Sequence, residues 1–98
     1  IEEISRRVKE KNPRTLIHVD GVQGFMRVPM HMNRMGVDLY SLSGHKIHGP
    51  KGIGALAMSD RARPLCIAFG GGQENGLRSG TENVPGIAGL GGQSLCPA

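Results

Sequence analysis

The chain has 98 residues, 16 of them Gly, and its 12 Lys and Arg against 8 Asp and Glu give a formal net charge of +4. Only 3% of the residues are aromatic, too few to supply the stacking side chains of a single-stranded nucleic-acid binder, and the basic residues are scattered. The two cysteines, Cys66 and Cys96, lack CxxC or zinc spacing, which argues against a disulfide framework and a metal site. Without a signal peptide or an apolar span in the sequence, we expect a cytoplasmic protein that binds neither nucleic acid nor membrane.

The length of the chain suits one small domain or part of a larger one. With 38% hydrophobic residues and no Trp, such a chain buries only a thin core. Its first residues read as the middle of a helix, and its last residues stop abruptly after a helix-like start. We therefore expect residues 1–98 to be a partial domain that lacks N-terminal and C-terminal portions.

Helical and strand-like segments alternate along the chain. Ile1, Ile4 and Val8 recur at helical spacing, and Asn12-Pro13 ends this first helix. Short apolar runs closed by glycine then predict strands. In chain order, the elements expected after the first helix are a buried strand over 15–20, one or two helical turns over 31–35, strands over 37–42 and 53–58, a glycine-rich loop over 70–83 and a small-residue helix from Pro85.

This alternation predicts an α/β fold with a largely parallel sheet that leaves room for one antiparallel strand. Asn83 is placed to cap the last helix, with Pro85 in its first turn, where a missing backbone N–H is tolerated.

Polar residues follow the first two predicted strands, and ligands of open α/β sheets bind at the carboxyl ends of strands. Ser43, His45 and Lys46 follow the second strand. A lysine is usually solvated, but one that is partly buried beside a hydroxyl and an imidazole is a nucleophile that condenses with aldehydes. Ser43 and His45 can donate hydrogen bonds to phosphate oxygens, and Gly44 lets the backbone approach them.

Asp20 and Gln23 follow the first strand. A carboxylate in this position can hold the protonated ring nitrogen of pyridoxal phosphate, although an Asp at a strand end is also a common turn residue. Gln23, three residues on, can reach the ring oxygen of the same cofactor.

Several blocks of the sequence together resemble the cofactor segment of the class V aminotransferases, a family of pyridoxal 5'-phosphate enzymes. The blocks are residues 18–24, 36–38 and 41–56, and two later ones, 70–74 and 78–86, narrow the resemblance to the cysteine desulfurase branch. The resemblance covers about Thr15 to Gly91. It implies part of the large domain of a fold type I enzyme, with a mainly parallel sheet and helices on both faces.

The resemblance also implies roles for single residues. Lys46 resembles the lysine that holds the cofactor as a Schiff base and moves protons at the substrate α-carbon. Asp20 is similar to the partner of the pyridinium nitrogen, and Gln23 to the partner of the phenolic oxygen.

Two further sets of residues in the family bind the phosphate. Ser43 and His45 resemble phosphate ligands within the subunit. Thr81 resembles a residue that reaches the phosphate of the neighbouring subunit, which implies a homodimer with shared active sites. Gly21 and Gly24 depart from the pattern, since the family has Ala or another small residue there.

The implied reaction is removal of sulfur from L-cysteine to give L-alanine and an enzyme-bound persulfide, from which a sulfur-acceptor protein is supplied, for instance in iron–sulfur cluster assembly. Neither Cys66 nor Cys96 stands where the family has its catalytic cysteine, so neither is assigned as the acceptor. A selenocysteine lyase, a small-amino-acid aminotransferase and a catalytically inactive fragment or binding remnant remain open as alternatives. The isolated chain is expected to be inactive.

Overall fold

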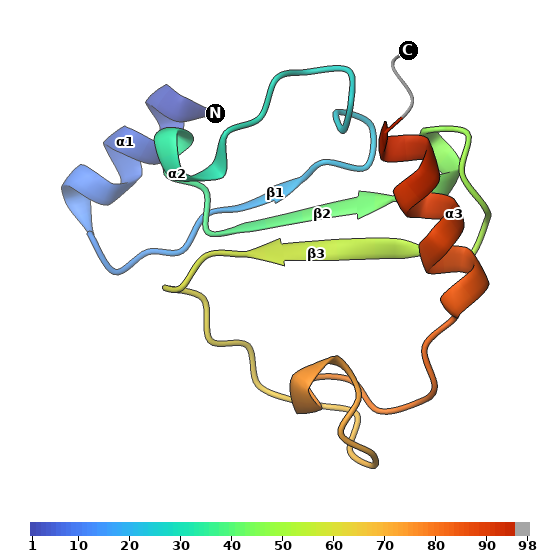
Figure 1. Ribbon diagram of the computed structural model, residues 1–98. Helices are drawn as coiled ribbons and strands as arrows, with labels where there is room; N and C mark the ends of the chain where they lie inside the picture. The colour runs from blue at the N-terminus through green and yellow to red at the C-terminus, as the bar shows by residue number, and fades with distance from the viewer. Residues whose placement is uncertain (96–98) are drawn as a thin grey trace.

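The computed structural model describes residues 1–95 and shows a thin molecule of 43 × 38 × 16 Å (Figure 1). A single sheet runs through its middle, with α1 and α2 towards one end of the strands and α3 towards the other. The elements are α1 (Glu2–Lys11), β1 (His18–Asp20), α2 (Met32–Met35), β2 (Leu39–Ser43), the 3₁₀ turn η1 (Gly44–Lys46), β3 (Gly54–Met58), the 3₁₀ turn η2 (Glu74–Gly76) and α3 (Val84–Leu95).

The sheet has the order β1-β2-β3. Strands β1 and β2 are parallel, with Asp20 opposite Ser41, whereas β2 and β3 are antiparallel, with Ser43 opposite Gly54. The α/β class is thus confirmed, and β3 is the antiparallel strand for which the sequence left room. Asn83 caps α3 as expected, because its Oδ1 accepts a hydrogen bond from the Gly86 amide at 3.1 Å.

The first strand is shorter and more exposed than the sequence predicts. Residues 15–17 lie outside β1, although the Ile17 carbonyl accepts hydrogen bonds from the Asp38 and Leu39 amides at 2.9 and 3.0 Å. His18 and Asp20 are exposed and Val19 is half-buried, so the expectation of a buried strand is wrong. A parallel strand is fully buried only where other elements cover both of its faces, and within residues 1–95 β1 is an edge strand.

The buried apolar residues are few and belong mainly to β2 and its surroundings. They are Val37, Tyr40, Ile47 and Ala62. Two polar residues, Ser5 and Asp38, are buried as completely as these. The thin core agrees with the expectation from composition.

Asp38 forms a buried hub of polar contacts just before β2. Its carboxylate lies 2.8 Å from the Lys9 ammonium and accepts hydrogen bonds from the Ile17 amide at 2.9 Å and the Ser59 hydroxyl at 3.3 Å. Burial alone would raise the pKa of this carboxyl, but the Lys9 and Ile17 hydrogen bonds and the charge of Arg61 outweigh it and hold the pKa below its usual range. These contacts connect α1 with the segments just before β1 and just after β3.

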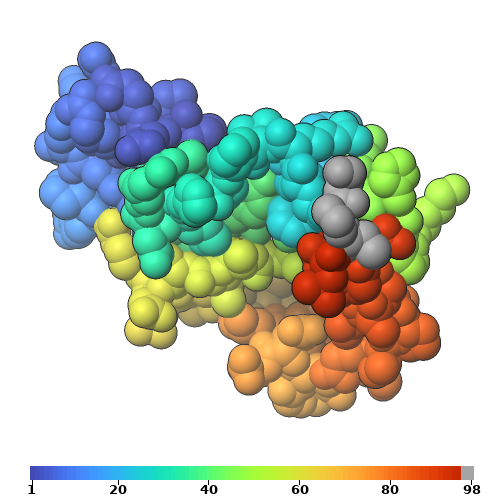
Figure 2. Space-filling model, turned by 45° about the horizontal axis from the view of Figure 1, so that its top comes forward, coloured from blue at the N-terminus to red at the C-terminus, as the bar shows by residue number. Residues whose placement is uncertain are grey.

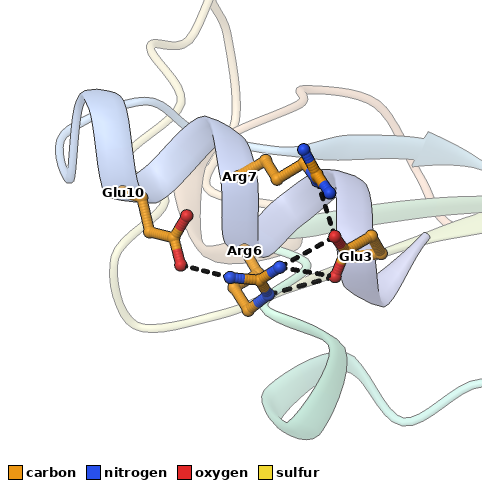
Figure 3. A network of polar contacts seen from close by, with 4 residues as sticks. All are labelled: Glu3, Arg6, Arg7 and Glu10. Carbon is orange, nitrogen blue, oxygen red and sulfur yellow. Dashed lines mark hydrogen bonds and ion pairs between the residues drawn. The ribbon is translucent and has the colours of Figure 1, made fainter.

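Helix α1 has a charged outer face (Figure 3). Arg6 forms ion pairs with Glu3 at 2.8 Å and with Glu10, and Arg7 pairs with Glu3. These pairs join residues three and four positions apart, the spacing at which side chains of a helix meet. Every partner is more than half exposed, so the network contributes little stability.

Candidate functional site

The carboxyl ends of β1 and β2 meet at one edge of the sheet, because the two strands are parallel neighbours. Asp20 is the last residue of β1 and Ser43 the last of β2. The Gly21 amide donates to the Ser41 carbonyl at 2.8 Å, which continues the pairing past the end of β1. Two predicted site residues from different strands are therefore brought to the same edge.

A tight turn follows β1 and carries Gln23. The Gly21 carbonyl accepts hydrogen bonds from the Gly24 amide at 2.9 Å and the Phe25 amide at 2.8 Å. The Asp20 carboxylate accepts one from the Val22 amide at 3.0 Å, so it acts as a turn residue, and yet it stays exposed to solvent and open to a ligand. Both interpretations of Asp20 offered by the sequence are compatible with this geometry.

The second strand passes directly into η1, which carries His45 and Lys46. The Ser43 hydroxyl lies 2.7 Å from His45 Nδ1, and Lys46 is half-buried beside the buried Ile47. Gly44 is buried, and a Cβ there would lie 2.8 Å from the Ile53 side chain, so only glycine fits the backbone at this point. The turn thereby gathers a hydroxyl, an imidazole and an amine around a closely packed main chain.

A contact between the two turns joins both parts of the candidate site. The Arg27 guanidinium, on the turn after β1, donates a hydrogen bond to the Lys46 carbonyl at 3.3 Å. The turn that carries Gln23 is thereby attached to the turn that carries Lys46. Sequence reasoning missed Arg27, because a single basic residue among apolar neighbours gives no signal that distinguishes this role.

Thr81 does not join the other five predicted site residues. It is exposed, in the loop between η2 and α3, and this orange segment lies below β3 in Figure 1, on the side of the sheet away from β1. The loop is held locally, since the Ser79 amide donates to the Ala68 carbonyl at 3.3 Å and Arg78 donates to the Gly80 carbonyl at 3.2 Å.

Few other reactive or metal-binding groups are found among residues 1–95. Cys66 is a free, half-buried cysteine whose thiol lies 3.3 Å from the Ala68 carbonyl, and Cys96 lies outside the described residues. Among residues 1–95, no group of three His, Cys, Asp or Glu is placed to hold a metal ion. Within the same range, no helix has both the length and the apolar character needed to cross a membrane.

A groove lies over β3. Leu56 and Met58 of β3 line it together with Leu65, Leu77 and Ile87. The yellow, orange and red segments that border it meet in the lower half of Figure 2. It is lined mainly by apolar side chains and contains none of the predicted site residues.

Comparison with known proteins gives consistent matches along nearly the whole chain. The model of the family described as aminotransferase class-V matches residues 1–93. A cysteine desulfurase of Nostoc sp. is 55% identical over 93 residues, which are 93% of this chain and 22% of that protein. A mitosomal cysteine desulfurase of Trachipleistophora hominis is 50% identical over 93 residues, again 93% of this chain and 21% of that protein.

Solved structures agree with these relatives. A NifS-like protein superimposes with a TM-score of 0.89 at 46% identity, over 95% of this chain and 26% of the other. A structure described as SspA in complex with cysteine gives a TM-score of 0.86 at 41% identity, over 95% of this chain and 27% of the other. The chain thus spans about a quarter of the length of the proteins that it matches.

Proposed function

Because the chain belongs to the class V aminotransferase family, we propose that it is the cofactor-binding part of a cysteine desulfurase, which removes sulfur from L-cysteine and yields L-alanine and an enzyme-bound persulfide. Its α/β fold is that of the large domain of fold type I pyridoxal-phosphate enzymes. The observation that carries the proposal is the edge at which β1 presents Asp20 while β2 and η1 present Ser43, His45 and Lys46.

The residues at this edge fit pyridoxal 5'-phosphate. The Ser43 hydroxyl and the His45 imidazole, 2.7 Å apart, are suited to the phosphate. The exposed Asp20 carboxylate suits the protonated ring nitrogen, and the Gln23 amide suits the ring oxygen. When bound, this cofactor supplies an electron sink for the electron pair left at the substrate α-carbon.

The residues of the candidate site have separate roles in this proposal. The Lys46 amine would hold the cofactor through its aldehyde carbon, with release of water, and would move the proton at the α-carbon of the substrate. Asp20 would hold a positive charge on the ring nitrogen. Arg27 positions Lys46 through the hydrogen bond to its carbonyl.

The sulfur atom passes from L-cysteine to a protein thiol, so that one C–S bond breaks, one S–S bond forms and L-alanine is released. We assign that thiol to neither Cys66 nor Cys96. Cys66 lies in the segment after β3, whereas Lys46 follows β2, and Cys96 lies outside the described residues. The persulfide thiol belongs to another part of the full-length protein.

The chain is, by this proposal, part of a longer protein and inactive alone. Support comes from the share of its relatives that it spans, 22%, and from the large apolar side chains that it leaves exposed. The whole protein is a cytoplasmic homodimer that passes sulfur to an acceptor protein, for instance for iron–sulfur clusters. Thr81, set apart from its own subunit's site, reaches the phosphate of the neighbouring subunit in this dimer.

Borohydride trapping in the full-length protein tests the assignment of Lys46. Wild type, Lys46→Ala and the control Lys51→Ala, an exposed lysine of the same loop, are incubated with pyridoxal phosphate, scanned for visible absorbance, reduced and mapped by peptide. We expect wild type and Lys51→Ala to carry the label on Lys46, and Lys46→Ala to lose both absorbance and label. A label that persists in Lys46→Ala contradicts the assignment, and an unlabelled wild type contradicts the cofactor proposal.

Activity separates the full-length protein from the isolated chain. With L-cysteine, pyridoxal phosphate and a reductant, the full-length protein should release sulfide and L-alanine, and the 98-residue chain should release neither. Turnover by the isolated chain would contradict the proposal that it is an inactive part.

A further inference from the structure

Gly21, the first residue after β1, has no room for a side chain. An ideal Cβ at this position would lie 2.0 Å from Cζ, 2.3 Å from Oη and 2.4 Å from Cε2 of Tyr40. Carbon atoms in favourable contact stand about 3.5–4.0 Å apart, so either the ring or the turn would have to move by about 1.5 Å to admit a methyl group.

The backbone itself does not demand glycine at this position. Gly21 lies outside the left-handed region that favours glycine. The glycines with positive φ are Gly36, Gly52, Gly70, Gly76 and Gly80. The Tyr40 ring therefore accounts for a glycine at position 21, where related sequences are expected to carry Ala.

The register of the sheet places the ring there. Tyr40 is opposite Val19 in the parallel pair, and alternation along β1 puts residues 19 and 21 on the same face as Tyr40. Tyr40 is 5% exposed, and its ring centroid lies 6.5 Å from that of Phe25, at 55° between the planes. The ring is thus fixed between the sheet and the turn that follows β1.

The Tyr40 hydroxyl also contacts this turn. Its Oη lies 3.5 Å from the Gly21 carbonyl oxygen, which accepts the two amide hydrogen bonds of the turn as well. Burial and the nearby Asp20 carboxylate raise the pKa of the Tyr40 hydroxyl, so it stays protonated and donates to this carbonyl.

We propose that Tyr40 is a positioning residue whose ring, seated on Gly21, sets where the Asp20 carboxylate and the Gln23 amide stand against the cofactor. This inference rests on the proposed function. Asp20 immediately precedes Gly21, and Gln23 lies on the turn whose carbonyl the ring contacts, so a shift at Gly21 moves both groups.

Gly24 provides a matched control on the same turn. A Cβ there would lie 3.8 Å from Tyr40 Oη and 3.9 Å from the Gly21 carbonyl oxygen, which are ordinary contact distances. In the full-length protein, Gly21→Ala and Gly24→Ala are compared for pyridoxal phosphate affinity, for the visible absorption maximum of the bound cofactor and for thermal unfolding of the cofactor-free form.

We expect Gly21→Ala to raise the cofactor Kd at least about tenfold and to shift the absorption maximum, because Asp20 and Gln23 move with the turn and lose their hydrogen bonds to the cofactor. Gly24→Ala should match wild type in both. Tyr40→Leu alone should raise the Kd in the same direction, because it removes the ring that sets the turn, and adding it to Gly21→Ala should restore thermal stability but not the lost affinity. Tyr40→Leu stays informative even where Gly21→Ala alone fails to fold, because it inserts no atom into the contact.

Each outcome decides one of the two proposals. Equal Kd values and spectra for Gly21→Ala and Gly24→Ala, or a wild-type Kd and spectrum for Tyr40→Leu, would overturn the role of Tyr40 alone. Absence of cofactor uptake by both wild type and Gly24→Ala would overturn the proposed function, and the role of Tyr40 with it.

Discussion

The part of the molecule built on β1 and β2 buries apolar side chains, whereas the segment that follows β3 leaves them exposed. Around β2, Val37 is 2% exposed and Tyr40 5%, and a buried carboxylate has its partners. After β3, Leu65, Ile67 and Phe69 are 88%, 90% and 84% exposed, and every residue of β3 is exposed. Figure 2 shows this second segment, yellow to orange, along the lower part of the molecule.

The difference separates a part that has a buried core of its own from one that leaves its apolar side chains uncovered. An apolar run as exposed as residues 65–69 marks a surface for another part of the protein or another subunit. The candidate site lies in the first part, apart from Thr81, which lies in the second. The geometry of the candidate site at the ends of β1 and β2 can therefore be described from this chain, whereas the surroundings of Thr81 cannot.

The largest expected effect concerns the hub of the first part. Asp38→Ala leaves the Lys9 ammonium and the Ile17 amide without their partner, and breaking a buried pair in this way lowers the free energy of unfolding by about 3 kcal/mol or more. Urea unfolding of the full-length protein measures this. Asp60→Ala, at an exposed aspartate, is the control and should stay within about 0.5 kcal/mol of wild type. Equal effects of the two changes would show that the hub is not a source of stability.

The second prediction compares the isolated chain with the full-length protein. Ile67→Ala should change the free energy of unfolding of the isolated chain by less than about 0.5 kcal/mol, because Ile67 is 90% exposed there. In the full-length protein we expect a loss of about 2 kcal/mol or more, the cost of truncating a side chain that further segments bury. Val37→Ala, in the core, is the control that should destabilise both forms. A small effect of Ile67→Ala in both forms would mean that this surface stays open.

A smaller effect follows from the pKa of Asp38, which is lower in the folded than in the unfolded protein. A depressed pKa stabilises the fold above the unfolded value of about 3.9, and this stabilisation is lost as the pH falls through the folded pKa. Unfolding between pH 6 and 2 should therefore show a steeper acid loss for wild type than for Asp38→Asn, which cannot titrate. Parallel curves would contradict the pKa shift.

The smallest effect is expected on the outer face of α1. Arg6→Ala removes ion pairs to Glu3 and Glu10 that are open to solvent. The small fall in melting temperature should disappear in 1 M NaCl, where the screening length is about 3 Å. Arg14→Ala serves as the control, since Arg14 has no ion pair among residues 1–95. A salt-independent loss would indicate that Arg6 also acts through packing.

The order of helices and strands could be predicted from the sequence because apolar spacing and glycine mark where elements begin and end. The sequence predicted where the helices and strands lie more reliably than it predicted which of their residues are buried. The apolar spacing predicted α1, yet Ile1 and Ile4 are 53% and 61% exposed, and Ser5 is the buried residue of the helix. Apolar periodicity shows which face of a helix can be buried. The elements that pack nearby decide whether that face is buried.

The candidate site was predictable where it depends on strand ends and not where it depends on register. Asp20 and Ser43 end their strands, so their meeting at one edge followed from parallel pairing. The seat of Tyr40 on Gly21 depends on which residues face each other across the sheet, which a single sequence does not give. The sequence did contain one indication of this contact. Tyr40 is the one tyrosine of the chain, and a buried tyrosine needs a partner for its hydroxyl.

Strand β3 has a further consequence for handling the molecule. Within residues 1–95 its outer side pairs with no other strand, and its residues, Gly54–Met58, include neither a charge nor a proline. An unprotected edge of this kind presents a row of free amides and carbonyls that templates the addition of another strand. Expressed alone, the chain is therefore prone to self-association through β3, and a lysine introduced at Ala55 or Ala57 would guard that edge.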